Sequence, residues 1–247
     1  MEGNTSEKVA EHDAPPVLDG AMSHKTAWLD LTVVLLIAVV PNLIWVFMPY
    51  QEVSEIMTFN SDMLNLLLGS VPVIAMCAYI ILKSEKNFVW HGLVRFQPIR
   101  DLAVAIGLTV FYFVSWSVIS TPVAMLESLT QATSLGYVFP RFEGGLMWPL
   151  MLVAYIANSF AEEGSIRILA ASRLEVLLSK PWLAIAIANA LFASYHLYQG
   201  WLAMVGVFVF GISLSVAFKL TKSIWPLIIG HTIVNITVTL MDSYSVW

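Results

Sequence analysis

Three ionisable residues, Glu162, Glu163 and Arg167, interrupt an apolar stretch that spans residues 147–178. A charged side chain at the centre of a bilayer costs roughly 2.5–3.5 kcal/mol even on the most lenient scale, so such residues usually mark a functional site. Residues four apart share a helical face, which predicts an ion pair between Glu163 and Arg167. Glu162 is then available as a general base that activates water. The alternative is a purely structural clamp of charges between helices.

Two histidines lie in later apolar stretches, each with a partner at four-residue spacing. Phe192 and His196 share one helical face, and His exchanges protons readily near neutral pH. His231 and Asn235 share another face, where an imidazole and an amide can donate hydrogen bonds to an oxyanion. Each pair could instead be an interhelical polar contact. We favour a site because three apolar stretches all provide polar groups, and a catalytic site requires the two imidazoles to lie near one another.

The composition indicates a membrane protein. Of the 247 residues, 58% are hydrophobic and 12% are charged, whereas a soluble domain has roughly 25% charged residues. Several apolar stretches reach the roughly 20 residues needed to span a bilayer. We therefore predict an all-α, polytopic transmembrane bundle of about seven spans, with six to eight as the range. The predicted spans lie near residues 28–48, 64–82, 102–126, 147–178, 181–200, 201–218 and 224–240, with a kink at Pro41.

Basic residues orient these spans. With a cytoplasmic N-terminus, all twelve Lys and Arg residues except Arg141 and Arg167 fall in the N-terminal tail or in cytoplasmic loops, as the positive-inside rule requires. We divide the chain into a disordered polar tail (1–26), three membrane helices with a connection (27–144) and a catalytic membrane core (145–243). The compact chain and its charge bias suggest a multi-pass protein of the bacterial cytoplasmic membrane. No basic stripe suits nucleic acid.

The three polar motifs occur in a fixed order: Glu162-Glu163-x-x-x-Arg167, Phe192-x-x-x-His196 and His231-x-x-x-Asn235. This ordered set resembles the signature of the CPBP intramembrane proteases. That family includes the type II CAAX prenyl endopeptidases and the bacterial Abi proteins linked to bacteriocin self-immunity. The resemblance covers roughly residues 145–240. One difference is Ile168, which stands where the family often has Gly.

The resemblance implies an endopeptidase that cleaves a peptide bond in or beside the membrane. The implied catalytic residues are Glu162, His196, His231 and Asn235, and the implied supporting residues are Glu163, Arg167 and Phe192. The first two catalytic residues would activate water, and the last two would stabilise the oxyanion. The expected substrate is a membrane-protein segment or a lipidated or apolar peptide.

Other interpretations remain open. A zinc ion could bind Glu162, His196 and His231, although the chain lacks a His-Glu-x-x-His motif and a metal-free glutamate mechanism needs the same residues. The single Cys77 excludes an intramolecular disulfide and a Cys-based zinc cluster. A non-catalytic membrane scaffold or bacteriocin-immunity protein of the same fold is the main alternative function. A proton-coupled carrier, in which the acids and imidazoles form a relay, is the second.

Overall fold

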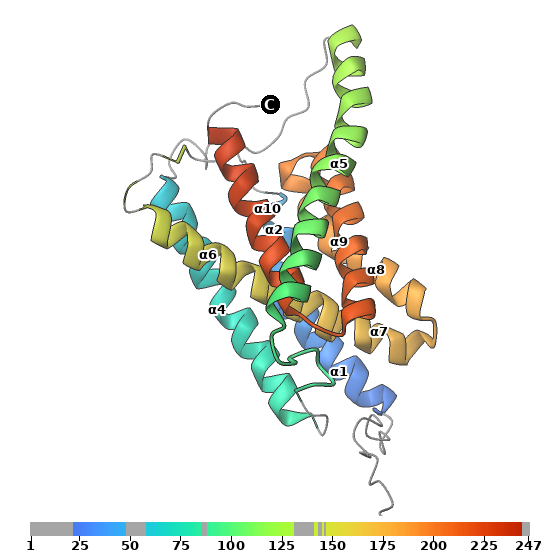
Figure 1. Cartoon of the computed structure of the whole chain (residues 1–247). Coiled ribbons are helices and arrows are strands. Elements are labelled where there is room, and N and C mark those ends of the chain that lie inside the picture. Colours follow the sequence, from blue (N-terminus) through green and yellow to red (C-terminus); the bar gives the residue numbers. More distant parts are fainter. Residues whose placement is uncertain are drawn as a thin grey trace, which may run out of the picture.

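The structure is a computed structural model that describes residues 22–47, 58–84, 88–130, 141–142, 145 and 147–243. Within these ranges every regular element is a helix, and the helices pack as a bundle (Figure 1). The elements are α1 (His24–Val34), η1 (Leu35–Val39), α2 (Val40–Trp45), α4 (Phe59–Lys83), α5 (Pro98–Thr130), α6 (Met147–Glu162), η2 (Glu163–Ala170), α7 (Ala171–Leu178), α8 (Pro181–Ser194), η3 (Leu197–Gln199), α9 (Trp201–Thr221) and α10 (Trp225–Ser243). The predicted all-α class is confirmed.

Four of the described helices are long and apolar enough to cross a membrane: His24–Ile44, Phe59–Lys83, Pro98–Pro122 and Trp201–Thr221. The protein is therefore an integral membrane protein with a helical bundle. The number of crossings and the side on which the N-terminus lies stay predictions. Of the predicted tail, residues 1–21 lie outside the described part, and α1 already begins at His24. Most of residues 127–146, between the predicted third and fourth spans, also lies outside it.

The first helix is irregular next to Pro41, where the sequence predicts a kink. The π-helical stretch η1 ends at Val39, and Pro41 lies at the start of α2. Proline has no backbone N–H, so it cannot donate the hydrogen bond that a continuous α-helix requires at this position. A change of helical geometry next to a proline has this physical cause.

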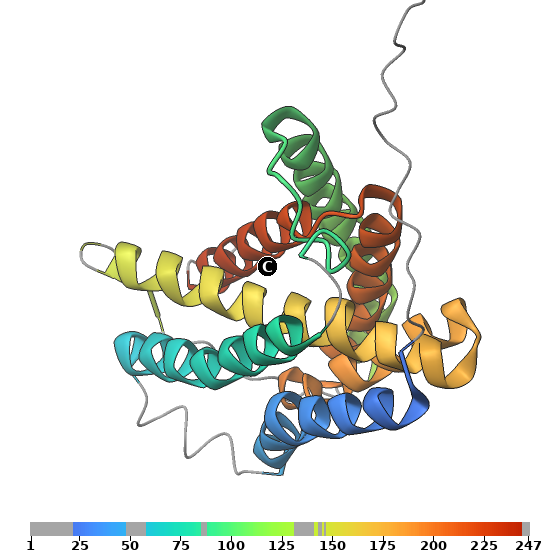
Figure 2. The same cartoon turned by 90° about the horizontal axis from the view of Figure 1, so that it is seen from below.

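The continuous helix α6–η2–α7 is the central element of the bundle. Its α6 part packs against α4 and α10, and its α7 part packs against α1 and α8. The view in Figure 2 shows this helix running between α4 and α1 on one side and α10 on the other. The segment that bears the first motif therefore has neighbours on several sides.

The largest apolar cluster surrounds η2. It combines side chains of α1, α4, η2, α7, α8 and the start of α10, among them Val34, Met76, Cys77, Leu169 and Ile228. All eight residues of η2 are buried. Charges in this stretch are thus surrounded by hydrocarbon, which strengthens every electrostatic interaction among them.

Candidate active site

The first motif lies where the central helix changes its geometry. Glu162 is the last residue of α6, and Glu163 opens the π-helical stretch η2. A π-helix bonds each N–H to the carbonyl five residues earlier, which widens the turn, and such stretches occur frequently at functional sites. Glu163 is fully buried, and the Glu162 side chain is 15% exposed.

Both glutamates contact one imidazole. His231 of α10 places Nδ1 2.7 Å from Oε1 of Glu163 and Nε2 3.4 Å from Oε2 of Glu162. The sequence predicts that Glu163 is paired and that Glu162 is free. In the structure Glu162 is not free, because it also contacts His231. The two ring nitrogens point in different directions, so a single imidazole can contact residues that differ by about 100° around a helix.

These contacts place one imidazole between two carboxylates. An ionised carboxylate can only accept hydrogen bonds, so Nδ1 of His231 donates to Glu163. Nε2 of His231 faces Glu162. The arrangement can thus provide a carboxylate base beside an imidazole.

Arg167 pairs with Glu163, as the four-residue spacing predicts. Its Nε lies 3.2 Å from Oε2 of Glu163, and both side chains are almost fully buried. The guanidinium also lies 4.4 Å from the centre of the Phe192 ring. Yet Nε, Nη1 and Nη2 form no hydrogen bond within the described part of the chain. The pair is therefore ionic but incompletely satisfied.

His196 lies just beyond the helix in which it was predicted. The α8 helix ends at Ser194 instead of continuing to Gly200, and His196 precedes the short turn η3. Gly200, with a φ of 101°, then allows the reversal into α9. His196 still bonds back to the helix, because its Nδ1 donates to the Phe192 carbonyl at 2.9 Å. This bond places the ring proton on Nδ1 and leaves Nε2 as an acceptor.

Phe192 connects the two histidines. The centre of its ring lies 4.8 Å from that of His196 and 6.2 Å from that of His231. Phe210 of α9 contacts His231 from another direction, at 5.7 Å between ring centres. The imidazoles thus lie around one aromatic side chain, as the three-motif prediction requires.

Asn235 is the motif residue least integrated with the others. It lies one turn beyond His231 on α10 and is partly buried. Within the described part of the chain it forms no hydrogen bond with another motif residue.

The first half of α10 packs closely against α5. A Cβ added to Gly230 would lie only 3.2 Å from the Ala105 carbonyl oxygen.

Several polar and aromatic neighbours were not predicted from the sequence. Asn158, one turn before Glu162, forms a side-chain hydrogen bond with it. The Tyr195 ring stacks on His196 at 4.7 Å. Asn189 of α8 is fully buried, and its Oδ1 approaches Gly211 near Nη2 of Arg167. Four-residue spacing from a glutamate could have indicated Asn158, but no local signal identifies the others.

The donor set does not fit a resident metal ion in this arrangement. Within the described residues, no three His, Cys, Asp or Glu side chains converge as metal ligands. The His231 nitrogens face the two carboxylates, and Nδ1 of His196 is engaged by a backbone carbonyl.

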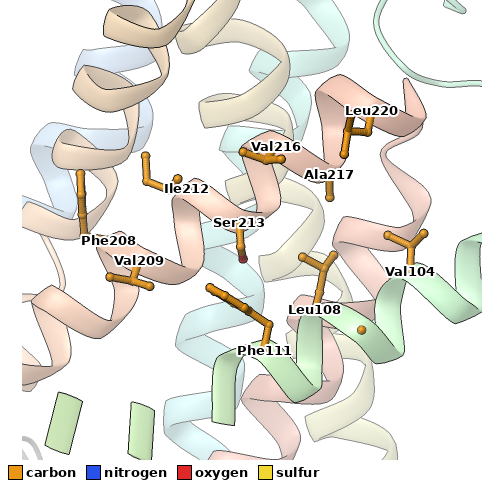
Figure 3. Close-up of a pocket in the computed structure, with 11 residues that line it drawn as sticks. Val104, Leu108, Phe111, Phe208, Val209, Ile212, Ser213, Val216, Ala217 and Leu220 are labelled. Carbon is orange, nitrogen blue, oxygen red and sulfur yellow. The ribbon is translucent and has the colours of Figure 1, made fainter. Parts of the chain in front are cut away.

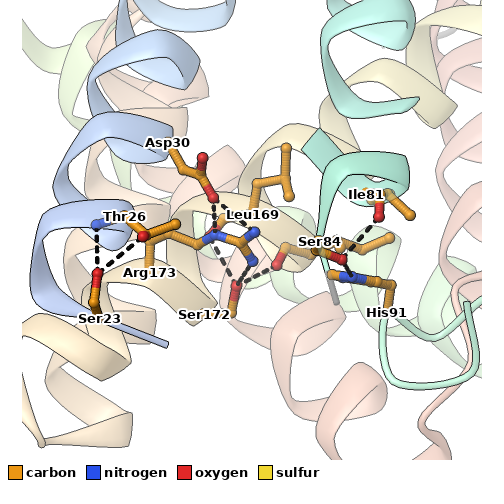
Figure 4. Close-up of polar contacts among 10 residues, drawn as sticks. Ser23, Thr26, Asp30, Ile81, Ser84, His91, Leu169, Ser172 and Arg173 are labelled. Carbon is orange, nitrogen blue, oxygen red and sulfur yellow. Dashed lines mark hydrogen bonds and ion pairs between the residues drawn. The ribbon is translucent and has the colours of Figure 1, made fainter. Parts of the chain in front are cut away.

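A second buried arginine lies further along the same helix (Figure 4). Nε and Nη2 of Arg173 donate to Oδ2 of Asp30 at 3.1 and 2.9 Å, and Nη1 donates to Ser172 Oγ at 3.0 Å. Nearby, His91 Nε2 lies 2.9 Å from Ser84 Oγ. This cluster ties α7 to α1 and leaves all three guanidinium nitrogens of Arg173 hydrogen-bonded.

An apolar groove lies away from the motif residues, between α5 and α9 (Figure 3). Its volume is about 740 Å³, and none of the motif residues lines it. Its walls are apolar and include Val104, Leu108, Phe111, Phe208, Ile212 and Val216. Leu108 also belongs to an apolar cluster with Phe210, which contacts His231. This cluster thus connects the groove to His231.

Comparison with known families agrees with the motifs. Residues 144–237 match the family model described as type II CAAX prenyl endopeptidase Rce1-like. The predicted resemblance to the CAAX proteases is confirmed over these residues. No curated protein and no solved structure matches the chain.

Proposed function

We propose that the protein is an intramembrane endopeptidase that hydrolyses a peptide bond with water activated by glutamate and histidine. The observation that carries this proposal is the buried arrangement of Glu162 and Glu163 on the two nitrogens of His231, at 3.4 and 2.7 Å. Ionisable groups held together in an apolar surrounding are costly, and they occur mainly at functional sites. The family match supports the same reaction class.

In the proposed reaction, Glu162 accepts a proton from water while the water oxygen attacks the scissile carbonyl carbon. Nε2 of His196 accepts a hydrogen bond from the same water and orients it. The new oxyanion accepts hydrogen bonds from protonated His231 and from Asn235. Glu162 then passes its proton to the amide nitrogen as the C–N bond breaks. Glu163 and Arg167 keep the glutamate helix and the imidazole in register.

The proposed substrate is an apolar or lipidated peptide or a segment of a membrane protein. Its reacting bond would have to reach a site surrounded by hydrocarbon, which disfavours strongly charged peptides. The apolar groove between α5 and α9 suits a hydrocarbon chain, and its apolar neighbour Phe210 contacts His231. A chain lying in this groove would keep the adjacent peptide near the site.

The test compares the wild type with Glu162→Gln in mild detergent. Each is incubated with a library of apolar and lipidated peptides, and new termini are sought by mass spectrometry. Cleavage by the wild type alone supports the hydrolase and assigns the water-activating carboxylate. Identical cleavage by both removes Glu162 from the mechanism. Binding without cleavage by either favours the scaffold, and proton-dependent flux in liposomes without new termini favours the carrier.

A further inference from the structure

Hydroxyl pairs connect α6 to α10 beyond the ionic site. Thr232 Oγ1 donates to Ser159 Oγ at 3.1 Å, and the Tyr155 hydroxyl bonds to Thr239 Oγ1. All four residues are at most 6% exposed. These bonds join residues 73 and 84 positions apart in the sequence.

The contacts run in antiparallel order. Along the continuous helix α6–η2 the order is Tyr155, Ser159 and Glu163, and their partners on α10 are Thr239, Thr232 and His231. The Ser159–Thr232 pair lies between the other two contacts. The spacing of four residues along α6 is about one turn, or about 6 Å of rise. The hydroxyl pairs and the His231–Glu163 contact therefore form one row of polar bonds along a single helix interface.

The ionic site depends on the axial position of α6 relative to α10. A slide of one residue is about 1.5 Å, more than the tolerance of a 2.7 Å hydrogen bond. Such a slide would also change the contact between Nε2 of His231 and Glu162. Apolar packing alone tolerates small slides better than hydrogen bonds do, because dispersion is not directional.

We propose that the Ser159–Thr232 hydrogen bond is a register lock, so that both are positioning residues which hold His231 between Glu162 and Glu163. The expected effect on the rate rests on the proposed hydrolase function. The expected effect on the position of the His231 imidazole does not. Ser159 precedes Glu162 by three residues, and Thr232 directly follows His231. The Tyr155–Thr239 bond holds the same interface further from the site.

The test uses Thr232→Val, which keeps the shape of the side chain and removes its hydroxyl. We expect kcat to fall about tenfold with KM changed less than about twofold. The pH profile of kcat should also shift, since the distance between Nε2 of His231 and Oε2 of Glu162 would change. Thr232→Ser restores the hydroxyl and should return the rate to within about twofold of the wild type.

Thr237→Val is the matched control. Thr237 lies on the same helix, and among the described residues its hydroxyl donates only to the Ile233 carbonyl of that helix. It should leave the rate and the pH profile unchanged. The double variant Ser159→Ala/Thr232→Val should lose no more rate than Thr232→Val alone, because both changes break one bond.

A readout independent of activity separates the lock from the hydrolase. The ¹⁵N NMR signals of the two ring nitrogens of His231 are assigned by their loss in His231→Gln. They should shift in Thr232→Val and stay unchanged in Thr237→Val. Unchanged signals in Thr232→Val, or a loss of melting temperature with an unaltered pH profile, would overturn the lock and leave a simple interhelical contact. Shifted signals in a protein that cleaves no peptide would support the lock and contradict the hydrolase.

Discussion

Two buried arginine–carboxylate pairs lie on the same continuous helix, and they differ in how well their polar groups are satisfied. Arg173 pairs with Asp30 of another helix, and each of its guanidinium nitrogens has a hydrogen-bond partner. Arg167 pairs with Glu163 of its own helix, and none of its guanidinium nitrogens forms a hydrogen bond among the described residues. The first pair connects two helices. The second lies beside His231, which Glu163 contacts.

This difference separates a structural tie from a candidate site. Buried polar groups in folded proteins are nearly all hydrogen-bonded, so unsatisfied ones need an explanation. Near Arg167 the unsatisfied atoms include Oε2 of Glu162 and Oε2 of Glu163. Real proteins accept such local costs mainly at functional sites. We therefore expect substitutions at the two clusters to separate activity from stability.

The largest difference should come from the carboxylates. Glu162→Gln should lower the cleavage rate by about 10³-fold, because an amide cannot accept a proton from water. Glu175→Gln is the control, since Glu175 lies on α7 with its side chain 46% exposed, 4.0 Å from Lys219, and should leave the rate within about twofold. Peptide cleavage followed by mass spectrometry measures both. Equal losses of cleavage rate in the two variants would contradict a catalytic role specific to Glu162.

Arginine substitutions should sharpen the comparison. Arg167→Gln leaves Glu163 buried without its cation, and Asp30→Asn leaves Arg173 buried without its anion; each should destabilise the fold by about 3–5 kcal/mol. Denaturation in mixed detergent micelles measures the stability. Among molecules that remain folded, Asp30→Asn should keep a rate within about threefold of the wild type, whereas Arg167→Gln should lose at least tenfold. A comparable loss of rate in Asp30→Asn would make Arg173 part of the site.

Gly211 tests how tightly the surroundings of Arg167 are packed. A Cβ there would lie 2.4 Å from Asn189 Oδ1 and 3.0 Å from Arg167 Nη2. Gly211→Ala should therefore cost about 1–3 kcal/mol. Gly107→Ala is the control, because its Cβ would meet no heavy atom within 4 Å, and a helical Gly→Ala change without steric conflict stabilises by roughly 0.5–1 kcal/mol. Equal melting temperatures of the two variants would contradict this packing.

The smallest effect concerns pH at the second cluster. His91 lies between α4 and α5, and its burial together with the nearby Arg173 charge lowers its pKa to about 4. Ser84 donates to the Ile81 carbonyl and so accepts from Nε2 of His91, while Nδ1 has no hydrogen-bond partner among the described residues. A proton added to Nδ1 would gain no acceptor.

Between pH 6.5 and 4 the unfolded chain binds a proton at His91 that the folded protein does not bind. Stability should therefore fall as the pH drops through this window and stay constant above it, as far as His91 contributes. Thermal unfolding at pH 7 and pH 5 measures the fall, and His91→Gln should reduce it. The same fall in His91→Gln as in the wild type would show that other groups cause it.

Local patterns in the sequence were sufficient for the helical class and for the ionic pair. Long apolar stretches with few charges specify membrane helices because backbone groups in hydrocarbon must bond within their own segment. Four-residue spacing specified the Glu163–Arg167 pair because such residues share a helix face. The order of the three motifs predicted the resemblance that the family model shows over residues 144–237. Each of these features depends on residues that are close together in the chain.

Only the tertiary structure decided which atoms meet. The two contacts of His231 with Glu162 and Glu163, the Asn189–Gly211–Arg167 approach and the Ser159–Thr232 bond join separate helices. Such contacts depend on the axial position and rotation of one helix against another, which many side chains determine together. The early end of α8 and the π-helical stretch η2 are likewise responses to packing, since local helix propensity is overridden by tertiary context.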